Sequence, residues 1–223
     1  MVKELSIAEA RDMFLAVAAE MIAAKDRLTK ADQKIGDGDH GIGIARGFEA
    51  VQVKLEEDSS ETLDALLKTV GMTLLSAIGG AGGAIFGTLF RAGAKTLSGR
   101  ESLDSESLAI MLSEGFAAVQ ARGGAKLGDK TMLDALGPAS EAASAVAPDA
   151  SLSDALAAAV AAAQSGTEAT IDMIATTGKA RSLGERSIGH PDPGAISTTL
   201  ILEAMERFVR RYQEKGGSRG ASD

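Results

Sequence analysis

The 223-residue chain contains no cysteine, which excludes disulfide bonds, zinc sites built on thiolates and cysteine nucleophiles. It also has no tryptophan and one tyrosine, and aromatic residues make up 3% of the sequence, so the core has to be aliphatic and rich in alanine. The 23 basic residues are outnumbered by 31 acidic ones, for a formal net charge of -8. Nucleic acid binding needs clustered basic side chains, so we expect no nucleic acid as a partner.

Long apolar runs are missing as well. The stretch of lowest charge, residues 71–90, is interrupted by glycines and lacks the continuous apolar sequence of a membrane span. The first ten residues lack the basic and then apolar pattern of a secretory signal. We therefore expect a cytoplasmic protein without membrane contact, whose length is sufficient to bury a core without a structural metal.

Most of the chain has the three-to-four spacing of apolar residues that is typical of amphipathic helices. Because no segment alternates between apolar and polar residues, we predict no sheet, and the predicted fold class is all-α. The eight predicted helices cover residues 6–28, 42–56, 61–78, 84–94, 104–121, 132–147, 151–174 and the segment that follows Asp192.

Start signals support several of these helices. Ser6 and Ser151 are each followed three residues later by an acidic residue, which is the spacing of a capping box. Asp192 precedes a proline, a pairing that favours a helix start. No linker divides the chain, so we predict one domain over residues 1–215 and a disordered tail over residues 216–223.

Three aspartates, Asp32, Asp37 and Asp39, lie within eight residues and are separated by glycines. Like charges at this spacing repel one another unless a cation lies among them. Carboxylate oxygens suit magnesium, which completes its coordination with other oxygens such as those of phosphates. A calcium loop of the EF-hand type fails, because its twelfth position would be Gly43 or Phe48. A solvated acidic turn is the alternative.

Two further loops have the composition of a phosphate site. Residues 79–83 read Gly-Gly-Ala-Gly-Gly before a predicted helix, and backbone amides at such a helix start can bind an anion. This segment lacks the Gly-Lys-Ser/Thr ending of a Walker loop, and a flexible hinge is the alternative. The loop over 178–194 adds Lys179 and Arg181, which reach phosphate if they are not ordinary surface residues. Both histidines lie in glycine-rich loops, His40 beside the three aspartates and His190 within 178–194; we expect His40 to contact a ligand and leave His190 open.

Four segments occur in order between residues 32 and 195: IGDGDHG, GGAGGAIFGT, GDKTMLDAL and LGERSIGHPDPGA. Together they resemble the nucleotide-binding L subunit of bacterial dihydroxyacetone kinases, which is also the C-terminal domain of the single-chain ATP-dependent kinases. With the helical segments outside them, the resemblance covers nearly the whole chain.

The resemblance implies an antiparallel eight-helix barrel that binds ADP or ATP at one end, with two Mg²⁺ ions held by Asp32, Asp37 and Asp39. It implies that the nucleotide lies among His40, Gly41, Ile42, Gly43, Gly80, Ala81, Gly82, Gly123, Met132, Asp192, Pro193 and Gly194. The family often has a serine in the glycine loop, where this chain has Ala81 and Gly82, so backbone amides alone would serve there. Lys179 stands where the family commonly has arginine, and Arg181 follows two residues later, so either cation is a candidate to reach phosphate.

The implied activity is phosphoryl transfer to dihydroxyacetone or another small ketose, which a separate K subunit holds through its own histidine. No catalytic nucleophile is then expected in this chain. In the subunit form of the family, a phosphocarrier M subunit rephosphorylates bound ADP; in the single-chain form, ATP exchanges. A homodimer stays open. Two alternative functions remain: a nucleotide-bound regulatory module without turnover, and a kinase component for another acceptor.

Overall fold

The structure is a computed structural model that describes residues 1–147 and 149–219. Its elements follow one another as β1 (Glu4–Ser6), α1 (Ile7–Ala23), α2 (Lys25–Ile35), α3 (His40–Glu56), α4 (Leu63–Ala77), α5 (Gly80–Ala92), β2 (Ser102–Asp104), α6 (Ser105–Gly123), α7 (Leu133–Ala145), α8 (Leu152–Ala169), the short 3₁₀ helices η1 (Thr170–Asp172) and η2 (Lys179–Ser187), and α9 (Pro193–Arg219).

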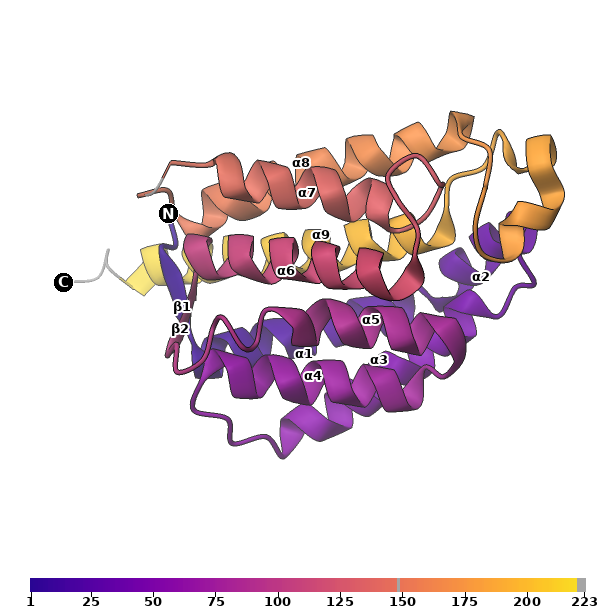
Figure 1. Ribbon diagram of the computed structural model, residues 1–223. Coiled ribbons are helices and arrows are strands. Elements are labelled where there is room, and N and C mark those ends of the chain that lie inside the picture. Colours follow the sequence, from indigo (N-terminus) through magenta and orange to yellow (C-terminus); the bar gives the residue numbers. More distant parts are fainter. Residues whose placement is uncertain (148, 220–223) are drawn as a thin grey trace.

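Eight of these helices form a closed ring, in which α1, α3, α4, α5, α6, α7, α8 and α9 each pack against the next and α9 packs against α1 (Figure 1). Neighbours in the ring run in opposite directions, so the connections alternate between its two ends (Figure 1). The predicted all-α antiparallel barrel is therefore confirmed. Helix α2 lies outside the ring at one end, where it packs against α3.

An aliphatic core fills the ring, as the shortage of aromatic residues required. Small residues bring helices close together: a Cβ added to Gly166 on α8 would lie 2.0 Å from the carbonyl oxygen of Asp134 on α7. Phe14 and Phe90 make an edge-to-face contact in the interior, with ring centroids 5.8 Å apart. The interior of the ring is thus filled by side chains.

The first predicted helix is wrong in its extent. The structure divides it at Ala24, and α2 then continues to Ile35 through residues that the sequence indicated as loop. The buried positions of α2 are Leu28, Asp32 and Ile35. Their spacing is helical, but an aspartate takes the middle position of the stripe, so the apolar pattern did not extend through it.

The prediction of no sheet is also wrong. Strands β1 and β2 form a two-stranded antiparallel ribbon in which Leu5 pairs with Leu103 and both side chains are buried. Each strand has three residues and one inward-facing leucine, which is too short for an alternating pattern to appear. The ribbon lies at the end of the ring opposite α2 (Figure 1).

Other predicted boundaries also differ from the structure. The glycine segment 79–83 is not a loop, because Gly79 is the N-cap of α5 and the helix begins at Gly80. Helix α9 continues to Arg219, past the domain boundary predicted at residue 215. Residues 220–223 of the predicted tail lie outside the described residues, so the disordered tail over 216–223 stays a prediction.

Candidate metal centre and cleft

The alternating path of the chain brings four distant connections together at the end of the ring near α2. They join α2 to α3, α4 to α5, α6 to α7 and α8 to α9 (Figure 1). Residues of all four line one cleft with a volume of about 600 Å³. Three of these connections contain or adjoin the glycine-rich segments singled out in the sequence, around Asp37, Gly79 and Gly178, and the topology brings these segments together.

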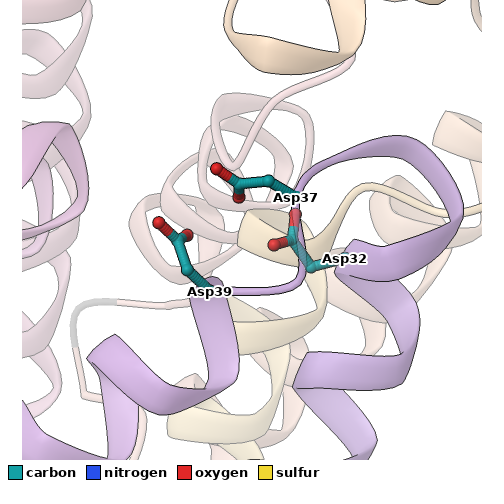
Figure 2. Close-up of side chains that lie close together, drawn as sticks. All are labelled: Asp32, Asp37 and Asp39. Carbon is teal, nitrogen blue, oxygen red and sulfur yellow. The ribbon is translucent and has the colours of Figure 1, made fainter.

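The three predicted metal ligands meet at this cleft. Asp32 lies in the last turn of α2, Asp37 in the connection and Asp39 at the N-cap of α3, and their side chains lie close together (Figure 2). One carboxylate oxygen from each lies within 4.8 Å of the other two. Asp32 is buried, whereas Asp37 and Asp39 are exposed. The Asp32 Oδ2 atom accepts hydrogen bonds from the amides of Gly38 at 2.8 Å and His40 at 3.2 Å, which fixes the bend between the helices.

Lys179 supplies a cation to this cluster from across the cleft. Its Nζ atom lies 2.5 Å from Asp37 Oδ2 and 2.9 Å from Asp39 Oδ2. The hydrogen bond from Lys179 lowers the pKa of Asp37, and the bonds to both carboxylates raise the pKa of Lys179. An ammonium group is thus already bound between two of the three carboxylates. This donor set, three hard oxygen ligands around a site that attracts a cation, fits magnesium.

Several helices begin at the cleft, and their first amides face the same end. The N-cap residues of α3, α5 and α7 are Asp39, Gly79 and Met132, and none of them caps its helix with its own side chain. The first amide of α3 donates to Asp32 Oδ2 and that of α7 to Thr131 Oγ1, which leaves the first turn of α5 without a side-chain acceptor among the described residues. Gly79 and Gly80 have φ values of 75° and 56°, a conformation that glycine adopts without strain. Unsatisfied amides and the positive ends of the helix dipoles favour bound anions at this end.

Arg46 holds the turn before α5 in place, although the sequence gave no reason to select it. Its Nε atom donates to the carbonyl of Ala77 at 2.7 Å, and a second guanidinium nitrogen donates to the carbonyl of Ile78. The guanidinium group therefore caps the C-terminus of α4 beside Gly79 and also lines the cleft.

His40 begins α3, and its Nε2 atom lies 2.8 Å from the hydroxyl of Ser197 on α9. Burial lowers the pKa of His40, while the carboxylates of Asp32 and Asp39 oppose that shift. The imidazole lines the cleft, with one nitrogen engaged by Ser197 on α9. Its predicted contact with a ligand stays a prediction.

Asp192 caps α9 at the opposite wall of the cleft. Its Oδ2 atom accepts from the amide of Ala195 at 2.8 Å, and its own amide donates to Thr170 Oγ1 at 2.9 Å. Burial raises the pKa of Asp192 to about 7, and the nearby carboxylate of Asp134 adds to this, against the backbone hydrogen bonds and Lys130. The helix start predicted at this position is present in the structure.

Most of the predicted nucleotide-binding residues line the cleft, namely His40, Ile42, Gly43, Gly80, Ala81, Gly82, Met132, Lys179, Asp192, Pro193 and Gly194. Gly123 lies instead in an adjoining apolar pocket of about 320 Å³, which Met132 also lines. Gly41 and Arg181 line neither space, and neither does His190. The binding roles of all these residues stay predictions.

Gly41 packs directly against α2, and its predicted contact with a nucleotide stays a prediction. A Cβ at this glycine would lie 2.3 Å from the carbonyl oxygen of Lys25 and 2.5 Å from the amide of Thr29, both on α2. Its hydrogen side chain therefore permits α2 and α3 to touch, which places Asp32 beside Asp39.

Within the described residues, no helix is long and apolar enough to cross a membrane.

Sequence comparisons agree with this arrangement. The DAK2 domain model matches residues 34–207. The chain is 43% identical over 179 residues to the ADP-binding subunit DhaL of the PEP-dependent dihydroxyacetone kinase of Escherichia coli (strain K12), which covers 80% of this chain and 85% of that protein. It is 40% identical over 189 residues to the ADP-binding subunit DhaL of PEP-dependent dihydroxyacetone kinase 2 of Listeria innocua, covering 84% and 88%.

A solved structure has the same fold. The crystal structure of the dihydroxyacetone kinase from C. freundii in complex with AMP-PNP and Mg²⁺ matches 93% of this chain with a TM-score of 0.71 and 26% sequence identity. This chain spans 35% of the length of that kinase chain. The likeness therefore concerns one part of that larger protein.

Proposed function

The chain belongs to the DAK2 domain family, and from this premise we propose that it is the ADP- or ATP-binding subunit of a kinase for dihydroxyacetone or a similarly small ketose. One observation carries the proposal. Three carboxylates, one oxygen of each within 4.8 Å of the others, meet beside a cleft at which the N-termini of α3 and α5 also lie. Carboxylates that attract cations and amides that attract anions suit a metal–phosphate ligand better than either ligand alone.

Asp32, Asp37 and Asp39 are the residues that would hold magnesium, and the family resemblance implies two ions. The metal, when bound, neutralises phosphate oxygens and so favours transfer of the terminal phosphoryl group. Asp32 is suited to a fixed position, because two backbone amides hold its carboxylate. Asp37 and Asp39 are exposed and form ion pairs with Lys179, so they can adjust to a ligand.

The cleft offers separate surroundings for the parts of a nucleotide. The first turns of α3 and α5, with His40–Gly43 and Gly80–Gly82, present amides suited to phosphates. The adjoining apolar pocket beside Gly123 and Met132 is suited to the base. Lys179, which already lies at the metal ligands, is the cation that we expect to reach phosphate, rather than Arg181.

We propose that the acceptor and its base come from partner subunits. The phosphoryl group leaves the β-phosphate oxygen of ATP and bonds to a ketose hydroxyl oxygen, whose proton passes to a base of the ketose-binding K subunit. This chain contributes position and charge, which are the main requirements of phosphoryl transfer. The similarity to PEP-dependent subunits favours a second partner, a phosphocarrier M subunit that rephosphorylates bound ADP in place.

The test begins with the purified chain. Mass spectrometry and phosphorus NMR should detect about one ADP per chain, released when EDTA removes the metal. Asp37→Asn should abolish this retention, while Asp12→Asn, an exposed charge on α1 away from the cleft, should leave it unchanged. No bound nucleotide, together with ATP binding that ignores magnesium and Asp37→Asn, would contradict the proposal.

A second step separates the kinase from a regulatory module without turnover. A ketose-binding K subunit and dihydroxyacetone are added to the chain loaded with ATP, and the phosphorylated ketose is measured by phosphorus NMR. Formation of the phosphate ester supports the kinase subunit. Retained nucleotide without any ester, across several small ketoses, would favour the regulatory module.

A further inference from the structure

Lys130 is a cation that lines the cleft but has no hydrogen left for a ligand. Its side chain is buried, and its Nζ atom donates to the backbone carbonyls of Thr170 at 2.7 Å, Met173 at 3.0 Å and Ser187 at 2.7 Å. An ammonium group has three N–H bonds, and these three carbonyls account for all of them. Phosphate binding by Lys130 would require one of these bonds to break.

The three carbonyls belong to the ends of helical segments in one connection. Thr170 is the C-cap of α8, Met173 is the C-cap of η1 and Ser187 is the last residue of η2. Carbonyls at helix C-termini lack partners within the helix and carry partial negative charge, so a buried ammonium is well suited to bind several of them. Lys130 thereby joins the start of the α8–α9 connection to a point 17 residues later.

The segment that carries Lys130 is itself held rigidly. Asp134 accepts hydrogen bonds from the amides of Gly128 at 2.6 Å and Thr131 at 2.7 Å. Asp129 accepts from the hydroxyl of Thr176 at 2.6 Å. Lys130 has a φ of 61°, and within the described residues it is the one non-glycine residue with a positive φ. Such a conformation persists where the surroundings determine it from several sides.

The connection that Lys130 holds, from α8 to α9, carries two residues that line the cleft. Lys179, at the start of η2, reaches Asp37 and Asp39, and Asp192 follows Ser187 by five residues and donates its amide to Thr170 Oγ1. We infer that Lys130 is a positioning residue, whose ammonium holds the α8–α9 connection closed so that Lys179 and Asp192 stand at the cleft. This inference rests on the proposed function, because it assigns a purpose to the same site.

The absence of cysteine allows a sharp test. In a Lys130→Cys variant the new thiol is unique, so alkylation of the unfolded chain with 2-bromoethylamine forms one C–S bond with loss of bromide. The product restores an ammonium at nearly the length of lysine. Alkylation with 1-bromopropane gives a neutral side chain of the same length as a matched control, and Lys126→Met tests an exposed lysine of the same loop.

Hydrogen exchange and MgADP titration then read the effect. In Lys130→Cys, the amides of Ala175, Thr176 and Gly189 should exchange at least about ten-fold faster, while amides within α1 should not change. The Kd for MgADP should rise about ten-fold. The aminoethyl product should recover both values, and the propyl product neither. Equal recovery by the two products would overturn the inference, because filling the space would then suffice.

A measurement on the unaltered protein keeps the inference testable if the variant does not fold. The Lys130 ammonium should give a slowly exchanging ¹⁵N signal, assigned by its absence in Lys130→Met or by its contacts to Thr170 and Ser187. We expect this signal to stay in place when MgADP is added. A large shift, which would indicate direct phosphate contact, would overturn the positioning role. Failure of the unaltered chain to bind MgADP would instead contradict the proposed function. Hydrogen exchange would still test whether the Lys130 ammonium holds the α8–α9 connection in place.

Discussion

The two ends of the barrel start their helices differently. At the end with the β1–β2 ribbon, side chains of Ser6, Asp104 and Ser151 cap α1, α6 and α8, and α4 has the amide of Leu63 bonded to the carbonyl of Arg100. At the cleft end, the N-cap side chains of α3, α5 and α7 do not cap their helices, and the first amides of α3 and α7 donate instead to Asp32 Oδ2 and Thr131 Oγ1. Within the described residues, α5 begins at Gly80 without a side-chain acceptor, whereas Asp192 caps α9. A cap satisfies the helix by itself, whereas an uncapped start keeps its amides for a ligand.

Glycine use divides the molecule in the same way. Among the glycines of positive φ in the described residues, Gly99 alone lies at the ribbon end, and the others lie in the connections around the cleft. At the ribbon end, the first amides of the helices therefore form hydrogen bonds within the chain. The cleft end adds carboxylates and first-turn amides that can bind a ligand, so we expect substitutions at the two ends to affect different measurements.

The largest expected effect is the loss of magnesium-dependent binding in Asp39→Asn. The Asp39 side chain is 70% exposed, and it forms an ion pair with Lys179. Loss of the Asp39 charge should therefore change the melting temperature by no more than about 2 °C. The Kd for MgADP should rise about 100-fold, since a charged ligand of the metal is lost. Isothermal titration with and without magnesium, beside scanning calorimetry, measures both, with Asp12→Asn as the control. Equal losses of stability and affinity would contradict the division between the ends.

Gly41→Ala should lower both the stability of the fold and the affinity for MgADP, because Gly41 contributes to the packing of α2 on α3 and to the position of Asp32. The added Cβ would lie 2.3 Å from a backbone oxygen of α2, which cannot move without separating α2 from α3. We expect a loss of about 2 kcal/mol in the free energy of unfolding, as for other overpacked positions, and a weaker affinity for MgADP. Denaturant titration and calorimetry are the measurements.

Gly43→Ala is the matched control for stability in the same turn of α3. Its Cβ would lie 3.4 Å from the side chain of Ile78, which is an ordinary contact, so the free energy of unfolding should be retained. If Gly41→Ala were as stable as Gly43→Ala, the close approach of α2 and α3 would not be what fixes Asp32 beside Asp39.

The double variant Ser6→Ala, Ser151→Ala tests the ribbon end. Each serine accepts a hydrogen bond from the amide three residues later in a capping box, and each loss should cost about 1 kcal/mol. The free energy of unfolding should therefore fall by about 2 kcal/mol, because the two caps belong to separate helices. The affinity for MgADP should not change. A parallel loss of affinity would indicate that the two ends are coupled through the core.

The sequence predicted the parts of this molecule whose causes are local. The apolar spacing identified the helices of the ring, and Asp32, Asp37 and Asp39 were found because eight residues of chain bring them together. Arg46 and Lys130 were missed as site residues, since their acceptors lie 31 or more positions away in the sequence. The packing of Gly41 against Lys25 and Thr29 of α2 was missed, because these partners could be known only from the fold.

Carboxylates at the two ends offer the last comparison, in their response to pH. Asp64, near the start of α4 at the ribbon end, accepts from Lys68 Nζ at 2.7 Å and from the amide of Gly99 at 3.1 Å. The hydrogen bond from Lys68 is the largest of the effects that lower the pKa of Asp64 from 3.8 to about 2. Asp192 at the cleft end shifts the other way, to about 7, because its burial is less fully offset.

The expected effect of Asp64→Asn is the smallest of the set. The folded pKa is depressed, so the stabilisation is present above pH 3.8 and is lost as the pH falls through about 2. Because Lys68 is 56% exposed, we expect a loss of about 1 kcal/mol in the free energy of unfolding at pH 6. Denaturant titrations from pH 6 to pH 2 should show the variant and the unaltered chain converging toward the acid end. A difference independent of pH would mean that Asp64 acts through its shape and neutral hydrogen bonds, and the ribbon end would then owe its stability to caps alone.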